Sequence, residues 1–143
     1  MEALVIVVQV LLLVFHQLTT LVDLYPFNNV RQYTLKERVT ECLVNGAIMV
    51  MPVIGFAVHI QWLMIASLVI YPALLLGEYL NWWQHYFFGP SAAWQETYNR
   101  LFKQTIIVLP PVKNHPVPNL EHCILHGLTL VATVITYFYF FTA

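Results

Sequence analysis

Glutamate and histidine side chains stand inside apolar stretches of this chain, where a membrane helix usually avoids ionisable groups. Glu78 and His126 are the clearest cases. Burial of such a group in a bilayer costs about 3 kcal/mol or more, so it usually points into a helical bundle and marks function. A low-dielectric layer favours the neutral form of a carboxyl group, and a neutral glutamic acid beside a histidine can give and take protons near neutral pH. We therefore expect acid–base chemistry, with Glu78 as the acid and His126 as the base.

Polar residues on each of four apolar stretches share one face, since their offsets of three, four and seven residues match the helical repeat. These stripes comprise His16, Thr19 or Thr20 and Asp23; Arg38, Glu41 and Asn45; Glu78, Asn81 and His85; and Asn119, His122, His126, Thr129, Thr133 and Tyr137. Seven residues span about 10 Å along a helix. The spacing predicts a deep layer of His16, Asn45, Glu78 and His126, and a mouth of Asp23, Arg38, Glu41, Asn81, His85, Asn119 and His122.

The expected pocket assigns a role to each polar or aromatic group. The candidate catalytic residues are Glu78, His126, His16 and Asp23, and the candidate substrate-binding residues are Arg38, Asn45, Asn81, Trp82, Trp83, His85 and Asn119. An aromatic wall can shelter an apolar substrate or stabilise a developing cation. Asp23 and Arg38 would hold a polar headgroup or phosphate, which the arginine fork binds bidentately. The predicted substrate is lipid-like or isoprenoid-like.

A metal or haem site is the alternative interpretation of the same residues. His122 and His126 stand at i and i+4, so that both imidazoles share one face. Glu78 and His16 would complete the set of ligands to a divalent metal, with His85 or Asp23 as further candidates. The motif HCILH differs from H-E-x-x-H because Cys123 occupies the position of the catalytic glutamate. His16 and His126, on opposite helices at matched depth, are candidate haem ligands.

Two further functional classes compete with these. Polar residues such as Thr129, Thr133 and Asn45 can simply tie helices together, each hydrogen bond contributing about 0.6 kcal/mol. An assembly subunit would not need a converging ionisable layer, but it would need a large lipid-facing interface. A transporter would need a polar route through both halves of the bundle. The segments 4–13 and 49–58 offer only Gln9 as a strongly polar group, and this counts against transport.

Composition and hydropathy predict an all-α integral membrane protein, a four-transmembrane-helix bundle in a single domain, 1–143. Hydrophobic residues make up 59% of the chain and charged residues 9%, whereas soluble domains are about 25% charged. The expected spans are residues 3–23, 35–58, 60–86 and 119–141, and an amphipathic interfacial helix is expected at 91–109. Thr34 and Glu37 match a capping box that begins the second helix, and Asn119 is a suitable N-cap for the fourth.

The cations predict the orientation. All six are Arg31, Lys36, Arg38, Arg100, Lys103 and Lys113, which belong to two loops, and basic residues collect on the cytoplasmic side. We expect both termini outside and the polar pocket in the cytoplasmic half of a cell inner (plasma) membrane.

Glu2 stands where a signal peptide would carry a basic residue, which indicates a retained helix. Cys42 and Cys123 are expected to stay reduced, and the net charge of −1 gives no reason to expect a nucleic acid partner. The oligomeric state is not predictable from these features.

In architecture and composition, four helices with an intramembrane glutamate, histidine and tryptophan resemble small sterol-isomerase-type membrane proteins. The likeness is one of architecture and composition. The expected activity, drawn from the polar residues, is that of a membrane-embedded isomerase, cyclase or hydrolase that uses acid–base chemistry or a metal. No motif of that family matches here, so no residue role is carried over.

Overall fold

A computed structural model describes residues 1–142, and its regular secondary structure in that range is helical, with one isolated bridge between Ile107 and Asn119. Four helical segments in that range are long and apolar enough to cross a bilayer, which confirms the predicted helical class and number of candidate spans. They are α1 (Glu2–Leu21), α2 (Leu35–Ala57), the continuous segment Gln61–Phe88, and α6 (Leu120–Thr142). The third comprises α3 (Gln61–Glu78), a π-helical turn η2 (Tyr79–Trp83) and α4 (Gln84–Phe88).

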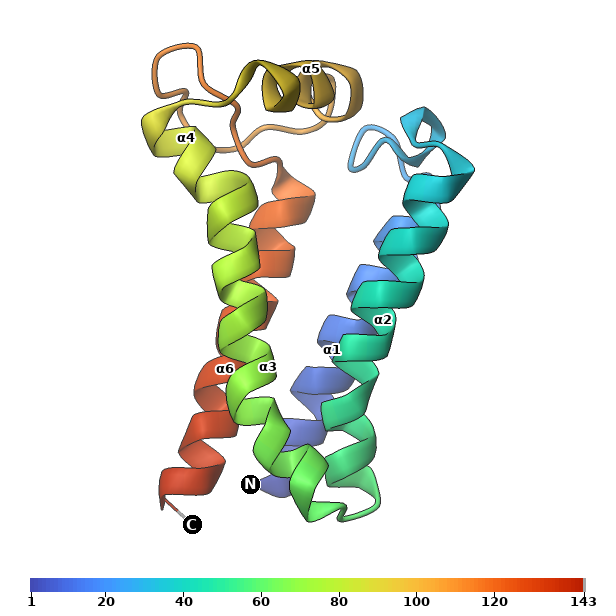
Figure 1. Cartoon of the computed structure of the whole chain (residues 1–143), viewed down its shortest axis with the longest axis vertical. Coiled ribbons are helices and arrows are strands. Elements are labelled where there is room, and N and C mark those ends of the chain that lie inside the picture. The colour runs from blue at the N-terminus through green and yellow to red at the C-terminus, as the bar shows by residue number, and fades with distance from the viewer. Residues whose placement is uncertain (143) are drawn as a thin grey trace.

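The four long helices form a ring. α1 packs against α2 and α6, and α3 packs against the same two helices. Both chain ends and the turn between α2 and α3 lie at one end of the bundle, which we call the terminal end. The short helix α5 (Ala92–Leu101) lies across the opposite end, the α5 end, where the α1–α2 pair diverges from the α3–α6 pair (Figure 1). All six cations belong to segments at the α5 end.

Two apolar clusters stabilise the two ends. In the terminal half, residues from all four long helices are buried together: Val8, Leu12, Met49, Tyr71 and Ala132. At the α5 end, aromatic and aliphatic residues of η2 and α5 form the second cluster: Trp82, Tyr98, Leu101 and Phe102. The outer surface is also apolar, since residues at helical spacing along α1 are exposed: Val7, Leu11, Val14 and Leu18. An apolar surface of this kind is typical of helices that face lipid.

Local capping sets the start of α2 and α6, as predicted. The Glu37 amide donates to Thr34 Oγ1 over 3.2 Å, and the Thr34 amide donates to Glu37 Oε2 over 2.7 Å. This completes the capping box. At α6, the His122 amide donates to Asn119 Oδ1 over 3.0 Å.

The helix predicted at 91–109 is shorter than expected: α5 ends at Leu101. The Thr105 hydroxyl donates to the Phe102 carbonyl over 2.6 Å just beyond that end. The β-branched run 106–108 then disfavours a helix. Its backbone bonds to other segments instead, since the Ile106 amide donates to the Pro26 carbonyl over 3.0 Å. Residues 103–119 are therefore a connection that folds back beneath α5 to α6.

Candidate functional site

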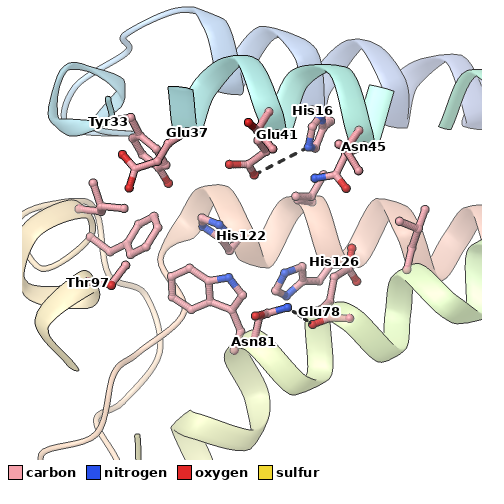
Figure 2. A pocket seen from close by; sticks show the side chains of 18 of the residues that line it. His16, Tyr33, Glu37, Glu41, Asn45, Glu78, Asn81, Thr97, His122 and His126 are labelled. Atoms are coloured by element: carbon pink, nitrogen blue, oxygen red, sulfur yellow. Dashed lines mark hydrogen bonds and ion pairs between the residues drawn. The ribbon is translucent and has the colours of Figure 1, made fainter. Parts of the chain in front are cut away.

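A cavity of about 840 Å³ lies among α1, α2, α3, η2, α5 and α6 at the α5 end. Figure 2 shows polar side chains from these elements directed toward the same space: His16, Tyr33, Glu37, Glu41, Asn45, Glu78, Asn81, Thr97, His122 and His126. The four residues of the predicted deep layer are all among them. Apolar side chains line the remainder, including Met49, Leu74 and Leu125. The space is of the size that commonly holds a small-molecule ligand.

Of the predicted site residues, all of which the structure describes, seven line this cavity: His16, Asn45, Glu78, Asn81, Trp82, His122 and His126. The five that lie outside its lining are Asp23, Arg38, Trp83, His85 and Asn119. Trp83 and Asn119 bond to histidines that do line it, as described below. The other three require correction.

Asp23 and Arg38 do not form the expected mouth. α1 ends at Leu21, so Asp23 lies on an exposed segment, where its Oδ1 accepts from the Arg31 amide over 3.4 Å. Arg38 lines a small adjoining pocket of about 20 Å³ instead of the large cavity, and both spaces are lined by His16, Tyr33, Glu41, His122 and Leu125. Glu121 also lines this small pocket, beside His16 and His122.

His85 is displaced because the third span is not a regular α-helix. The π-turn η2 inserts one residue into the repeat and shifts every later side chain around the axis. Trp82 therefore lines the cavity, and the His85 ring lies against Trp94 with centroids 5.4 Å apart. Asn81 compensates the altered backbone pattern, since its Nδ2 donates to the Gly77 carbonyl over 2.8 Å.

The tautomer of His126 follows from its contact with Trp83. The indole Nε1–H donates to His126 Nδ1 over 3.0 Å. An indole nitrogen can only donate, so Nδ1 must accept and the neutral imidazole carries its hydrogen on Nε2. His126 is thereby presented as a hydrogen-bond donor rather than as the base that the sequence predicted.

His122 is held in the opposite tautomer. Asn119 Oδ1 accepts from the His122 backbone amide, which identifies that atom as the amide oxygen. The same oxygen lies 2.6 Å from His122 Nδ1, so Nδ1 carries the hydrogen and Nε2 keeps its lone pair. The ring packs against Trp82 with centroids 4.1 Å apart and edge-on to Phe102 at 5.2 Å. Neighbouring histidines on α6 thus differ in chemistry: His122 offers an acceptor and His126 a donor.

Glu78 is hydrogen-bonded through one of its carboxyl oxygens. Its Oε1 lies 2.6 Å from Thr129 Oγ1, and that hydroxyl also lies 3.0 Å from the Leu125 carbonyl. The hydroxyl has one hydrogen for two acceptors. A proton on Glu78 would donate to Thr129 and make both contacts hydrogen bonds. Glu78 Oε2 is buried and has no partner among residues 1–142.

Gln17, which the sequence stripes missed, does not line the cavity but contacts His16, which does. Gln17 Nε2 donates to the Cys42 carbonyl over 3.2 Å and approaches His16 Nδ1 at 3.4 Å. His16 Nε2 lies 4.0 Å from Glu41 Oε1 across the α1–α2 interface. A Cβ at Gly46 would lie 2.4 Å from Gln17 Nε2, so the glycine makes room for this contact. A glycine inside the second apolar stretch, Gly46, was the available sequence signal for a close contact between helices.

The cavity opens sideways between α2 and α3. Its exposed lining residues belong to the facing edges of the third span and α2: Ala73 and Asn81 on one side, and Lys36, Thr40 and Val44 on the other. Val44 continues into the apolar outer surface and is 52% exposed. The opening therefore begins among charged residues and extends along apolar ones.

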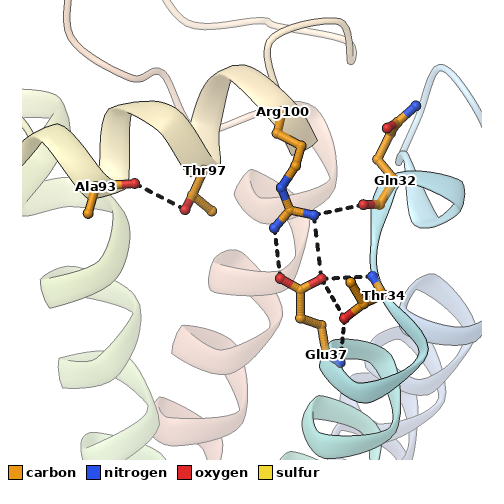
Figure 3. Close-up of polar contacts among 6 residues, drawn as sticks. All are labelled: Gln32, Thr34, Glu37, Ala93, Thr97 and Arg100. Carbon is orange, nitrogen blue, oxygen red and sulfur yellow. Dashed lines mark hydrogen bonds and ion pairs between the residues drawn. The ribbon is translucent and has the colours of Figure 1, made fainter.

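The α5 segment covers the end of the cavity. Leu101 and Phe102 are buried against it. Figure 3 shows the polar link between α5 and α2, in which Arg100 Nη2 lies 2.7 Å from Glu37 Oε1. Arg100 Nη1 also donates to the Gln32 carbonyl over 2.8 Å. The hydrogen bond to Glu37 raises the pKa of Arg100, which stays charged.

Tyr33 completes the cover beside this link. Burial raises the pKa of its phenol above the ordinary value, so the side chain remains a neutral hydrogen-bond donor at the edge of the cavity. Its ring packs edge-on to Phe102 with centroids 6.1 Å apart.

The predicted metal ligands do not converge. Across residues 1–142, histidine, cysteine, aspartate and glutamate side chains form no group of three or more that could hold a metal ion. His122 and His126 have ring centroids 5.8 Å apart, and each Nδ1 is engaged by another side chain. The metal alternative therefore has no support in this arrangement, and no contact in it supports haem.

Searches with models of protein families, among curated proteins and among solved structures find nothing that matches this chain.

Proposed function

We propose that this protein is an intramembrane enzyme that performs acid–base chemistry on a lipid-like or isoprenoid-like substrate. One observation carries the proposal: a single cavity, lined by Glu78, His122 and His126 and opening sideways, combines a carboxyl group, an acceptor nitrogen and a donor nitrogen. Hydrogen bonds hold the two imidazoles in complementary tautomers, which packing ties alone would not require.

We place the α5 end in the cytoplasm and both termini outside, in the plasma membrane. The six cations at the α5 end support this orientation, because basic residues are retained on the cytoplasmic side. The exposed apolar surface supports insertion. A cysteine introduced at Gln104 should then react with an impermeant thiol reagent only from the cytoplasmic side, and outside labelling would contradict the orientation.

The substrate enters from the bilayer in this proposal. The sideways opening between α2 and α3 supports that route, and the cover formed by α5 closes the direct path from water. The apolar lining of Met49, Leu74 and Leu125 suits a hydrocarbon chain. Transport across the membrane is disfavoured, because the terminal half is filled by the cluster around Leu12 and Tyr71.

The reaction that fits these groups moves a proton within the substrate. His122 Nε2 accepts a proton from a substrate C–H, and the Glu78 carboxyl group gives a proton to a different substrate atom. His126 Nε2–H donates a hydrogen bond to an oxygen that gains negative charge in the transition state. The substrate loses one proton and gains one, as in a double-bond isomerisation. After the product leaves, the His122 imidazolium gives its proton to water and the Glu78 carboxylate takes a proton from water, which restores the site and supplies a solvent proton to the next product.

Deuterium uptake tests this proposal across all the lipids of a cell at once, so the substrate need not be chosen in advance. The purified protein is reconstituted with a total lipid extract of the cells that express it, in D₂O buffer, and the lipids are analysed by mass spectrometry. We expect deuterium in a defined lipid species, and a rate lower by about 10²- to 10⁴-fold for Glu78→Gln. Thr142→Val, which alters a hydroxyl at the terminal end of α6, is the matched control and should behave as wild type. Equal uptake by Glu78→Gln and wild type, or uptake no greater than in protein-free vesicles, would contradict the proposal.

A further inference from the structure

We infer that Thr105 and Asn119 are positioning residues that connect the end of α5 to His122 and select the tautomer in which His122 is the base. The tautomer itself is independent of the reaction, whereas the role of His122 as base rests on the proposed function. Neither Thr105 nor Asn119 lines the cavity. They act through another residue.

The connection is a directional chain of hydrogen bonds. Asn119 Nδ2 donates to Thr105 Oγ1 over 2.9 Å, and the Thr105 hydroxyl donates in turn to the Phe102 carbonyl over 2.6 Å. At the other end, Asn119 Oδ1 accepts from His122 Nδ1. An amide nitrogen can only donate and a carbonyl oxygen can only accept, so the direction of every step is fixed.

This chain does more than cap α6. Capping requires only that Asn119 Oδ1 accept from a backbone amide of the first turn, and that bond is present at 3.0 Å. The additional contacts to the His122 ring and to Thr105 are not needed for the cap. Asn119 is fully buried and Thr105 is 8% exposed, so water does not compete for their polar atoms.

Phe102 links the chain to the position of α5. Its carbonyl group ends the hydrogen-bond chain, and its ring lies edge-on to His122 with centroids 5.2 Å apart. Phe102 is also the C-cap of α5. If α5 moved away from the cavity, both contacts would move with it and His122 would be released to take the other tautomer. The tautomer of His122 with hydrogen on Nδ1 is therefore favoured most strongly when α5 covers the cavity.

NMR of protein labelled with ¹⁵N-histidine reports the tautomer directly, and a His122→Gln sample assigns the His122 signals by their loss. In wild type we expect His122 with hydrogen on Nδ1. Thr105→Val, which removes the hydroxyl at similar volume, should shift the tautomer equilibrium toward Nε2–H by about tenfold, the factor typical of one hydrogen bond. Thr105→Ser should restore the wild-type signal. Thr133→Val is the matched control, since the Thr133 hydroxyl bonds only within α6 over 2.7 Å.

The outcomes separate the two proposals. Hydrogen on Nε2 of His122 in wild type would overturn the inference. This measurement uses the wild-type protein and does not depend on whether a variant folds. An unchanged tautomer in folded Thr105→Val would overturn it as well. Nδ1–H in wild type with the expected shift, but no deuterium uptake into lipid, would support the positioning chain and contradict the proposed enzyme function.

Discussion

The terminal half and the α5 half of this bundle use buried polar groups in different ways. In the terminal half, donors reach across to neighbouring helices: Gln9 Nε2 donates to Thr136 Oγ1 over 3.4 Å, and the Tyr137 hydroxyl donates to the Leu68 carbonyl over 2.7 Å. In the α5 half, hydrogen bonds hold one side of Glu78 and of the histidines and leave the other side toward a cavity. Similar residue types therefore tie helices together in one half and present reactive atoms in the other.

The largest expected effect comes from removing the base. His122→Gln should lower deuterium uptake into lipid by about 10²- to 10⁴-fold, because no other acceptor is held in its position. Gln9→Leu changes a buried polar residue of the terminal half and should leave the uptake rate unchanged. Mass spectrometry of the two variants side by side tests the contrast between the two halves. A comparable loss of uptake in Gln9→Leu would show that the two halves do not differ in this way.

Alanine substitutions of two glycines, one in each half, should change the free energy of unfolding by different amounts. A Cβ at Gly55, near the α2–α3 turn, would lie 2.7 Å from Leu63 Cβ and 2.8 Å from the Met64 backbone nitrogen. Gly55→Ala should therefore lower the free energy of unfolding by about 1–3 kcal/mol. A Cβ at Gly77, on the cavity wall, would meet no atom within 4 Å among the described residues. Gly77→Ala should leave the free energy of unfolding unchanged within measurement error. Unfolding of both variants in mixed detergent micelles gives the comparison, and equal stabilities would show that the terminal half is not packed as described.

A smaller effect is expected at the link between α5 and α2. Arg100 and Glu37 are about 40% and 39% exposed, and exposed pairs of this kind contribute about 0–1 kcal/mol. Arg100→Gln should therefore leave global stability nearly unchanged while α5 opens more often. Iodide quenching of the cavity residue Trp94 should rise about twofold, the change expected for about 0.5 kcal/mol. Lys103→Gln alters a neighbouring exposed cation and is the control. Identical quenching in both variants would mean that this ion pair does not keep α5 closed.

Much of this architecture is predictable because local rules set it. Apolar runs of sufficient length specify the four long helices, and the Thr34–Glu37 box specifies where α2 begins. The stripes also identify the four residues of the deep layer, because seven-residue spacing preserves both face and depth within a regular helix.

The remaining features depend on contacts between distant segments. The π-turn at Tyr79–Trp83 breaks the periodicity on which the placement of His85 relied. The partners Trp83 and His126 lie 43 positions apart, so no local pattern could show that Trp83 fixes the His126 tautomer. Beyond the end of α5, Thr105 bonds back to Phe102 in a local turn, and the Ile106 backbone then bonds to Pro26 and Leu120, which lie in other segments. Tertiary contacts, rather than propensity, determine the chemistry of this site.

We propose that the cavity of the α5 half receives a lipid-like molecule from the bilayer through the gap between α2 and α3. Quenching by dibrominated stearic acid of Trp82 and Trp94, which line the cavity, tests this in vesicles with a Trp62→Phe background, since Trp62 is exposed on the outer surface. Ala73→Phe obstructs the α3 edge of the gap, and Val69→Phe, one turn away on α3 at a 71% exposed position, is its matched control. We expect saturable quenching in the parent protein and in Val69→Phe, and its loss in Ala73→Phe. Quenching that is non-saturable and equal in all three proteins would show that no lipid-like molecule enters the cavity by this route.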